Sequence, residues 1–213
     1  MIKKTKKKVL VTGSSGFLGS NLVDFLKKKK FDVVLFDNQP SQFKSKNDKE
    51  FLGSLLDKNL IREALKDCDA IFHFAAISDI DFSIKNPLET IQTNVIGTIN
   101  IIEEALKQKI HRFIYASTIY IHSAQGGFYR ISKQASELYI EEYNKRYSLD
   151  YTILRFGTVY GARSSKKNNL TKIISNALKK NVLKYTGGTS GAVRRYINVT
   201  DAAKASYEIL NKK

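Results

Sequence analysis

Residues 9–22 read V-L-V-T-G-S-S-G-F-L-G-S-N-L, and this stretch decides the fold class of the chain. Its apolar start predicts a buried strand, and its apolar spacing from Phe17 onward predicts a helix. Gly13, Gly16 and Gly19 lie at the turn between them. In that context glycines allow a tight turn and a close approach of the backbone to a pyrophosphate, whose charge the helix N-terminus favours. The stretch therefore predicts a dinucleotide-binding unit.

From this turn to residue 156, short apolar runs alternate with amphipathic helical stretches. The predicted strands span 8–12, 32–37, 70–76, 112–117 and 151–156, and the predicted helices span 17–30, 58–66, 87–108 and 129–147. Such alternation predicts an α/β fold with a parallel sheet and helices on both faces. Right-handed crossovers make it a doubly wound Rossmann arrangement.

The pattern changes after Gly157. The predicted elements are a polar loop at 163–169, a helix at 170–180, a turn at 186–191, a strand at 195–199 and a closing helix at 201–210. We therefore expect residues 1–156 to form a dinucleotide-binding domain. Residues 157–213 are expected to form a small, shortened substrate lobe that is not an independent domain.

Composition limits the classes of partner. No apolar run is long enough to span a bilayer, and Cys68 is the only cysteine, so we expect a cytoplasmic protein without disulfides. His73, His111 and His122 are scattered, which argues against a metal site, and His73 lies in a strand predicted to be buried in the core. The formal net charge of +16 admits an anionic partner such as RNA. However, the lysine runs lack interleaved aromatic residues, so we expect solvated lysines and no nucleic acid.

Asp37 ends the second predicted strand. A carboxylate there can accept hydrogen bonds from the adenosine ribose hydroxyls and would repel a 2′-phosphate, which favours NAD over NADP. The alternative is a turn residue at the strand end, since Asn38 and Pro40 follow.

Tyr129 and Lys133 lie four residues apart in Y-R-I-S-K, on one face of a predicted helix. A tyrosine has a pKa of about 10, so it serves as an acid or base near neutral pH only when that pKa is lowered. The lysine charge one turn away has this effect, and we expect the pKa of Tyr129 to be well below its ordinary value. Combined with the glycine turn, the pair predicts hydride-transfer chemistry.

Several motifs along the chain match one known family. They are T-G-S-S-G-F-L-G at 12–19, I-F-H-F-A-A at 71–76, N-P and T-N-V-I-G-T within 86–98, F-I-Y-A-S-T at 113–118, Y-R-I-S-K at 129–133, L-R-F-G-T-V-Y-G at 154–161 and R-R-Y-I-N-V-T-D-A-A at 194–203. On these residues the chain resembles the extended short-chain dehydrogenase/reductases, specifically their sugar-nucleotide epimerase/dehydratase branch. The match runs in order over nearly the whole chain.

The resemblance implies NAD as cofactor, and it implies site residues. Those implied to line or hold the dinucleotide site are Gly13, Ser15, Gly16, Phe17, Leu18, Gly19, Asp37, Asn38, Ser54, Leu55, Phe74, Ala75, Ala76, Asn94, Tyr129, Lys133 and Phe156. Within this set, Asn94 would support the fourth and fifth strands. Tyr129 would be the acid/base, and Lys133 would hold the nicotinamide ribose. Thr118 would stabilise the reacting oxygen, with Ser117 as its competitor. Thr158 and Arg194 match positions that contact the nucleotide part of the substrate.

The chain also departs from the family pattern. Dehydratases and decarboxylases of this branch carry acidic residues just after the catalytic Ser/Thr, whereas Ile119 and Tyr120 stand here. Thr158 replaces the usual Asn, and family members commonly continue well beyond the segment at 194–203. These features disfavour dehydration and decarboxylation, and they leave the substrate half less complete than the cofactor half.

We therefore expect an NAD-dependent epimerase acting on a nucleotide-linked sugar. One alternative is an NAD(P)H-dependent reductase of a 4-keto sugar, which would oxidise its cofactor. Another is a non-catalytic NAD-binding protein, associated with RNA. The resemblance further implies a homodimer, paired through the helices at 87–108 and 129–147. Asp79 and Asp81 follow the strand at 70–76 and are expected to be solvated loop residues rather than an acid/base pair.

Overall fold

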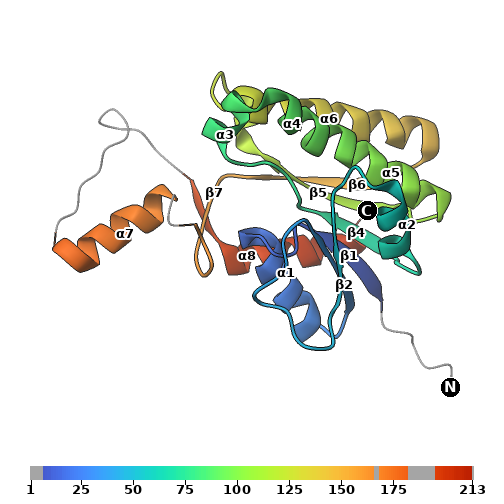
Figure 1. Cartoon of the computed structure of the whole chain (residues 1–213), viewed down its shortest axis with the longest axis horizontal. Helices are drawn as coiled ribbons and strands as arrows, with labels where there is room; N and C mark the ends of the chain where they lie inside the picture. The colour runs from blue at the N-terminus through green and yellow to red at the C-terminus, as the bar shows by residue number, and fades with distance from the viewer. Residues whose placement is uncertain (1–6, 166–167, 182–194, 213) are drawn as a thin grey trace.

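The computed structural model of the protein describes residues 7–165, 168–181 and 195–212. Within them, one parallel six-stranded sheet has the order β3-β2-β1-β4-β5-β6. Its strands are β1 (Lys8–Thr12), β2 (Asp32–Asp37), β3 (Lys49–Leu52), β4 (Ala70–His73), β5 (Arg112–Thr118) and β6 (Asp150–Phe156). The predicted doubly wound Rossmann fold is confirmed (Figure 1).

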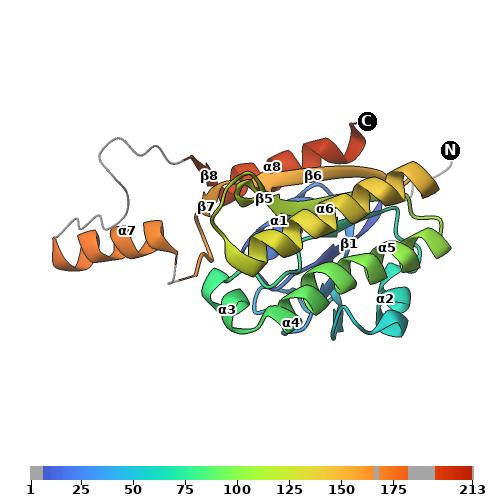
Figure 2. The same cartoon turned by 90° about the horizontal axis from the view of Figure 1, so that it is seen from above.

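Helices cover both faces of the sheet (Figure 2). The helices of this part are α1 (Phe17–Lys28), α2 (Lys58–Leu65), α3 (Ile80–Lys85), α4 (Pro87–Ile91), α5 (Gly97–Lys107), α6 (Gly127–Tyr147) and α8 (Val199–Glu208). Leu22 of α1 and Ala203 of α8 pack in one apolar layer, while Ile61 of α2, Ile101 of α5 and Ile140 of α6 pack in the other. Because the strands are apolar on both faces, each layer of helices has a core to bury.

The site position follows from the strand order. β1 pairs in parallel with β2 on one side and with β4 on the other. The chain therefore leaves neighbouring strands in opposite directions at the carboxyl ends of β1 and β4, and a crevice opens there.

The structure differs locally from the predicted elements. The single helix predicted at 87–108 is divided into α4, a π-helical segment (Gln92–Ile96) and α5. β3 and α3 were not predicted, because β3 is a short and partly exposed edge strand and α3 is a helix of six residues. α8 begins two residues earlier than predicted, because the Asn198 side chain accepts a hydrogen bond from Thr200 N (2.9 Å) and caps it.

The described elements between Gly157 and α8 are separate from the main sheet, whereas α8 packs beside α1. β7 (Thr158–Tyr160) pairs in parallel with β8 (Tyr196–Asn198), and α7 (Asn169–Lys180) lies apart from the main sheet in both views (Figures 1 and 2). The turn predicted at 186–191 lies outside the described residues.

Candidate active site

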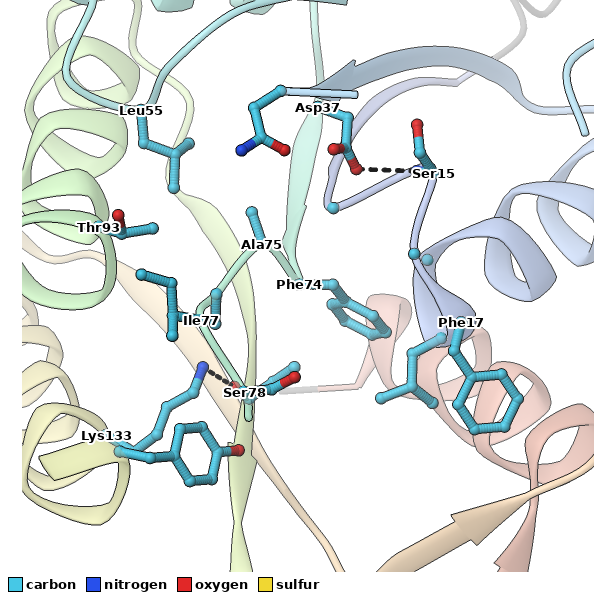
Figure 3. Close-up of a pocket in the computed structure, with 18 of the residues that line it drawn as sticks. Ser15, Phe17, Asp37, Leu55, Phe74, Ala75, Ile77, Ser78, Thr93 and Lys133 are labelled. Atoms are coloured by element: carbon cyan, nitrogen blue, oxygen red, sulfur yellow. Dashed lines mark hydrogen bonds between the residues drawn. The ribbon is translucent and has the colours of Figure 1, made fainter. Parts of the chain in front are cut away.

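A cleft of about 720 Å³ opens at the carboxyl ends of the strands (Figure 3). The predicted site residues that line it are Gly13, Ser15, Gly16, Phe17, Leu18, Gly19, Asp37, Asn38, Ser54, Leu55, Phe74, Ala75, Ala76, Ser117, Thr118, Tyr129, Lys133 and Phe156. They come from α1, β2, β5, α6, β6 and the segments that follow β1, β2, β3 and β4, so the fold brings together residues that are far apart in sequence.

The glycine turn is shaped by close backbone contacts. Gly13 has a φ of 71°, and a Cβ built there would lie 2.6 Å from Ala75 N. A Cβ on Gly19 would lie 2.0 Å from Gly13 O. A Cβ on Gly16 would meet only Gly13 O, at 3.2 Å, and would otherwise point into open space. Gly13 and Gly19 are therefore required by the fold, whereas the absence of a side chain at Gly16 leaves room for a ligand.

The N-terminus of α1 suits an anion. Gly16 is its N-cap and supplies no side-chain hydrogen bond to the first turn. The backbone N–H groups and the helix dipole at this end are then available to a phosphate group. The turn thus fits the pyrophosphate of a dinucleotide.

Asp37 lies at the end of β2, facing the glycine turn. Its Oδ2 accepts a hydrogen bond from Ser15 N at 2.9 Å (Figure 3). Its Oδ1 accepts one from Gln39 N at 3.1 Å. The carboxylate therefore supports the local turn and also lines the cleft. Each oxygen can accept more than one hydrogen bond, so both interpretations of Asp37 are compatible with this geometry.

Lys133 reaches the cleft from α6. Its Nζ donates a hydrogen bond to Ala116 O at 2.8 Å (Figure 3). The same Nζ lies 4.5 Å from the centre of the Tyr115 ring. The residue is only 3% exposed. Burial lowers the pKa of Lys133 to about 7, and the carboxylate of Glu137 opposes this shift.

Tyr129 departs from expectation in its acidity. Burial raises the pKa of Tyr129 to about 12, although a hydrogen bond with Thr118 lowers it, and the neighbouring Tyr120 raises it. The expected lowering by Lys133 is not found, because the cost of burying a phenolate dominates and Lys133 is not among the groups that shift this pKa. Tyr129 thus holds its proton at neutral pH in this environment.

The end of β5 distinguishes Thr118 from Ser117. The Thr118 hydroxyl contacts Tyr129 and accepts a hydrogen bond from Tyr120 N at 3.2 Å. The Ser117 hydroxyl is buried and has no hydrogen-bond partner among the described residues. The hydroxyl coupled to the tyrosine is therefore that of Thr118.

Two predicted residues that the structure describes, Asn94 and Thr158, do not line the cleft. Asn94 is buried behind it: its Oδ1 accepts from Ile77 N at 2.8 Å, and its Nδ2 donates to Ile77 O and Ser132 Oγ. Asn94 thus holds the segment after β4 in place. Thr158 is the first residue of β7. Its two neighbours, Gly157 and Val159, line the cleft, but Thr158 itself does not. Arg194 lies outside the described residues.

His73 is a core residue, as predicted. Its Nδ1 lies 2.7 Å from Thr12 Oγ1, and its Nε2 lies 2.9 Å from Thr98 Oγ1. Burial, together with the charge of Lys133, lowers the pKa of His73 to about 3.

Asp79 was expected to be a solvated loop residue. Its Oδ1 accepts a hydrogen bond from Phe82 N at 3.1 Å and caps α3, so it lies at a helix start rather than in a loop.

Other residues line the cleft without having been predicted. They include Gln39, Gly53, Leu56, Ile77, Ser78, Ile80, Glu89, Gln92, Thr93, Tyr120, Gly157 and Val159. Those after β4 were identifiable, because the segments that leave the carboxyl ends of strands at a switch point form the crevice. Those from α4 and the π-helical segment had no comparable signal.

The described part of the chain contains no group of three His, Cys, Asp or Glu residues able to hold a metal ion. None of its helices is long and apolar enough to cross a membrane.

Known proteins resemble this chain over nearly its whole length. The family model described as "NAD dependent epimerase/dehydratase family" matches residues 9–213. A putative UDP-glucose 4-epimerase of Methanocaldococcus jannaschii is 33% identical over 96% of this chain and 74% of its own. The UDP-glucose 4-epimerase of Thermotoga maritima, solved with UDP-glucose, is 27% identical with a TM-score of 0.86, covering 97% of this chain and 74% of that one. The Thermus thermophilus UDP-glucose 4-epimerase, solved with NAD, is 27% identical with a TM-score of 0.84, covering 97% and 75%.

Proposed function

Since the chain belongs to the NAD-dependent epimerase/dehydratase family, we propose that it is an NAD-dependent epimerase acting on a nucleotide-linked sugar. One observation carries this proposal: a single cleft joins the glycine turn and Asp37 to Thr118, Tyr129 and Lys133. A protein that only stored or sensed NAD would need the first group of residues and not the second.

The residues of the cleft fit NAD. Gly16 leaves space beside the N-terminus of α1, and Asp37 supplies acceptors for ribose hydroxyls at the far end of the turn. A 2′-phosphate would be repelled by this carboxylate, so the cleft favours NAD over NADP.

The catalytic roles follow from position and charge. Tyr129 takes the proton from a sugar hydroxyl, and Thr118 donates a hydrogen bond to the same oxygen. Lys133, in its charged form, would hold the nicotinamide ribose. Its charge and that of a bound oxidised nicotinamide would together favour the Tyr129 phenolate, which burial disfavours in the protein alone. A bound, oxidised NAD would supply the acceptor for the hydride of the sugar carbon and the source for its return to the other face, which would invert that centre.

The residues after Thr118 support epimerisation over dehydration. Ile119 is apolar, and Tyr120 presents a phenol to the cleft where a carboxylate would be needed to protonate a leaving hydroxyl. For the substrate nucleotide we propose contacts from Thr158 and Arg194. The family implies a homodimer, and Leu88 of α4 and Leu138 of α6, both strongly exposed, supply an apolar surface for it.

The test is the near-ultraviolet absorbance of the NAD-loaded protein as UDP- and dTDP-linked sugars are added singly. Transient appearance of the reduced nicotinamide band, with the epimer as product and no net loss of NAD, is the expected result. Net consumption of NADH with a 4-keto sugar would instead identify a reductase. Absence of both, in a protein that binds NAD, would contradict the enzymatic proposal.

A further inference from the structure

A buried ion pair lies directly behind the proposed catalytic lysine. Tyr129, Lys133 and Glu137 follow one another at four-residue spacing on α6, so they share one face of the helix. Lys133 and Glu137 are both buried, and Glu137 is not among the residues that line the cleft. A charged residue in this position needs an explanation, because an unpaired buried charge is costly.

Glu137 is paired with Arg155 of β6. Arg155 Nη2 donates to Glu137 Oε2 at 2.7 Å, and its Nε lies 3.2 and 3.3 Å from the two carboxylate oxygens. The Arg155 side chain is 41% exposed, so water partly screens its charge. The charges therefore alternate from the interior to the surface: Lys133, then Glu137, then Arg155.

Among the described residues, Glu137 is the one carboxylate found to shift the pKa of Lys133. Tyr129 lies on its own helix, the neutral ring of Tyr115 on β5 lies against Nζ, and His73 on β4 stays uncharged at neutral pH. The Tyr115 phenol does not titrate in this range, since burial raises its pKa. Glu137 raises the pKa of Lys133 against the lowering caused by burial.

We propose that Glu137 and Arg155 are positioning residues that set the charge state of Lys133. Glu137 shifts the buried lysine toward its protonated form, and Arg155 limits how much of the carboxylate charge acts on Lys133. The inference rests on the proposed function, in which the lysine must be cationic to favour the Tyr129 phenolate and to hold the ribose.

The two members of the pair are then expected to act in opposite directions. Glu137→Gln removes the negative charge, so the pKa of Lys133 falls by about one unit. Arg155→Met removes the competing cation, so the pKa of Lys133 rises. Arg155→Lys keeps the positive charge and is the matched control, with a pKa close to that of the unaltered protein.

The measurement is a pH titration of ¹³Cε-labelled lysines by NMR on the protein alone, with the Lys133 resonance identified by its loss in Lys133→Met. Opposite shifts in Glu137→Gln and Arg155→Met support the proposal. Shifts in the same direction, or no shift in Glu137→Gln, overturn it, because a purely structural pair would affect both variants alike. Arg155→Gln replaces Arg155→Met if thermal melting shows that the methionine variant does not fold.

A separate NAD titration, followed by tyrosine fluorescence, tests the underlying function. Failure of NAD to bind the unaltered protein would refute the proposed function while leaving the lysine titration interpretable. Normal NAD binding with unshifted Lys133 titration would refute only the role of Glu137 and Arg155.

Discussion

Tyr129 and Lys133 depart in opposite directions from their ordinary acidities, and the cause is the same. In both cases burial penalises the charged form, so the pKa of Tyr129 rises to about 12 and that of Lys133 falls to about 7. At neutral pH the tyrosine keeps its proton, while the lysine is close to its titration midpoint. Small electrostatic changes near Lys133 therefore have large effects on its charge, whereas Tyr129 needs added positive charge beside it before it can act as a base.

Replacing Tyr129 by Phe tests the acid/base assignment. The change removes one hydroxyl and keeps the ring, so NAD binding should persist while kcat falls by about 100-fold to 10,000-fold. Stopped-flow absorbance with the identified sugar and an NAD titration measure the two effects. Tyr147→Phe, at an exposed position on the same helix, is the control and should retain turnover. Undiminished turnover in Tyr129→Phe would assign the role to another group.

His73 makes the stability of the protein depend on pH. Its folded pKa is about 3, below the ordinary 6.5, so between these values the unfolded state binds a proton that the folded state does not. The free energy of unfolding should therefore fall as the pH is lowered through this window, by roughly 3 kcal/mol between pH 7 and pH 4 from this group. Urea unfolding at the two pH values measures the loss. NMR should show the His73 ring neutral at pH 5, and a protonated ring at that pH would contradict the assignment.

In the turn between β1 and α1, the fold requires glycine at two positions, and a third glycine leaves space for a ligand. Gly13 and Gly19 are in contact with backbone atoms that cannot move without disturbing the sheet or the turn. Gly16 has a φ of −75° and a ψ of 176°, an extended conformation open to any residue, and space beside it. The three glycines thus serve different purposes, although they look alike in sequence.

Alanine at Gly16 and at Gly19 should have contrasting effects. Gly19→Ala places its Cβ against Gly13 O and should lower the free energy of unfolding by about 1–3 kcal/mol. Gly16→Ala should fold normally and weaken NAD binding about tenfold, because its methyl group occupies the space left for the pyrophosphate. Urea unfolding and NAD titration of both variants test this. Normal NAD affinity in Gly16→Ala would show that the pyrophosphate does not approach this position.

At the scale of the whole molecule, apolar side chains are exposed on α4 and α6, two helices that pack against one another. Leu138 is 66% exposed there, and Leu88, Ile131 and Tyr139 are also exposed. A soluble monomer rarely exposes an extended apolar patch, so this surface supports the proposed pairing of two copies.

Leu138→Glu should disrupt the proposed dimer with little change in the fold, because the side chain makes little contact within its own chain. Leu178→Glu on α7, where the leucine is 80% exposed, is the matched control and should leave the oligomeric state unchanged. Sedimentation velocity measures both. If Leu138→Glu and the unaltered protein sediment alike, α6 does not form the proposed interface.

Local patterns predicted most of the sheet. β1 and β2 have the predicted bounds, and the glycine turn lies where the strand–glycine–helix pattern placed it. The residues of the cleft were also largely predictable, since the carboxyl ends of parallel strands meet at one edge. β3 was missed because its residues are half exposed and carry no clear alternation.

The sequence by itself determined the βα repetition, the dinucleotide turn and the Tyr129–Lys133 spacing, because hydrophobic periodicity and glycine placement act over a few residues. Only the tertiary structure decided that Thr118 rather than Ser117 contacts Tyr129 and that Asn94 bonds to Ile77 after β4. It also decided that burial raises the pKa of Tyr129 above its ordinary value. These properties depend on which groups surround a side chain and how much water they exclude. Such surroundings come from distant segments such as β4, β5, β6 and α6, which only folding brings together.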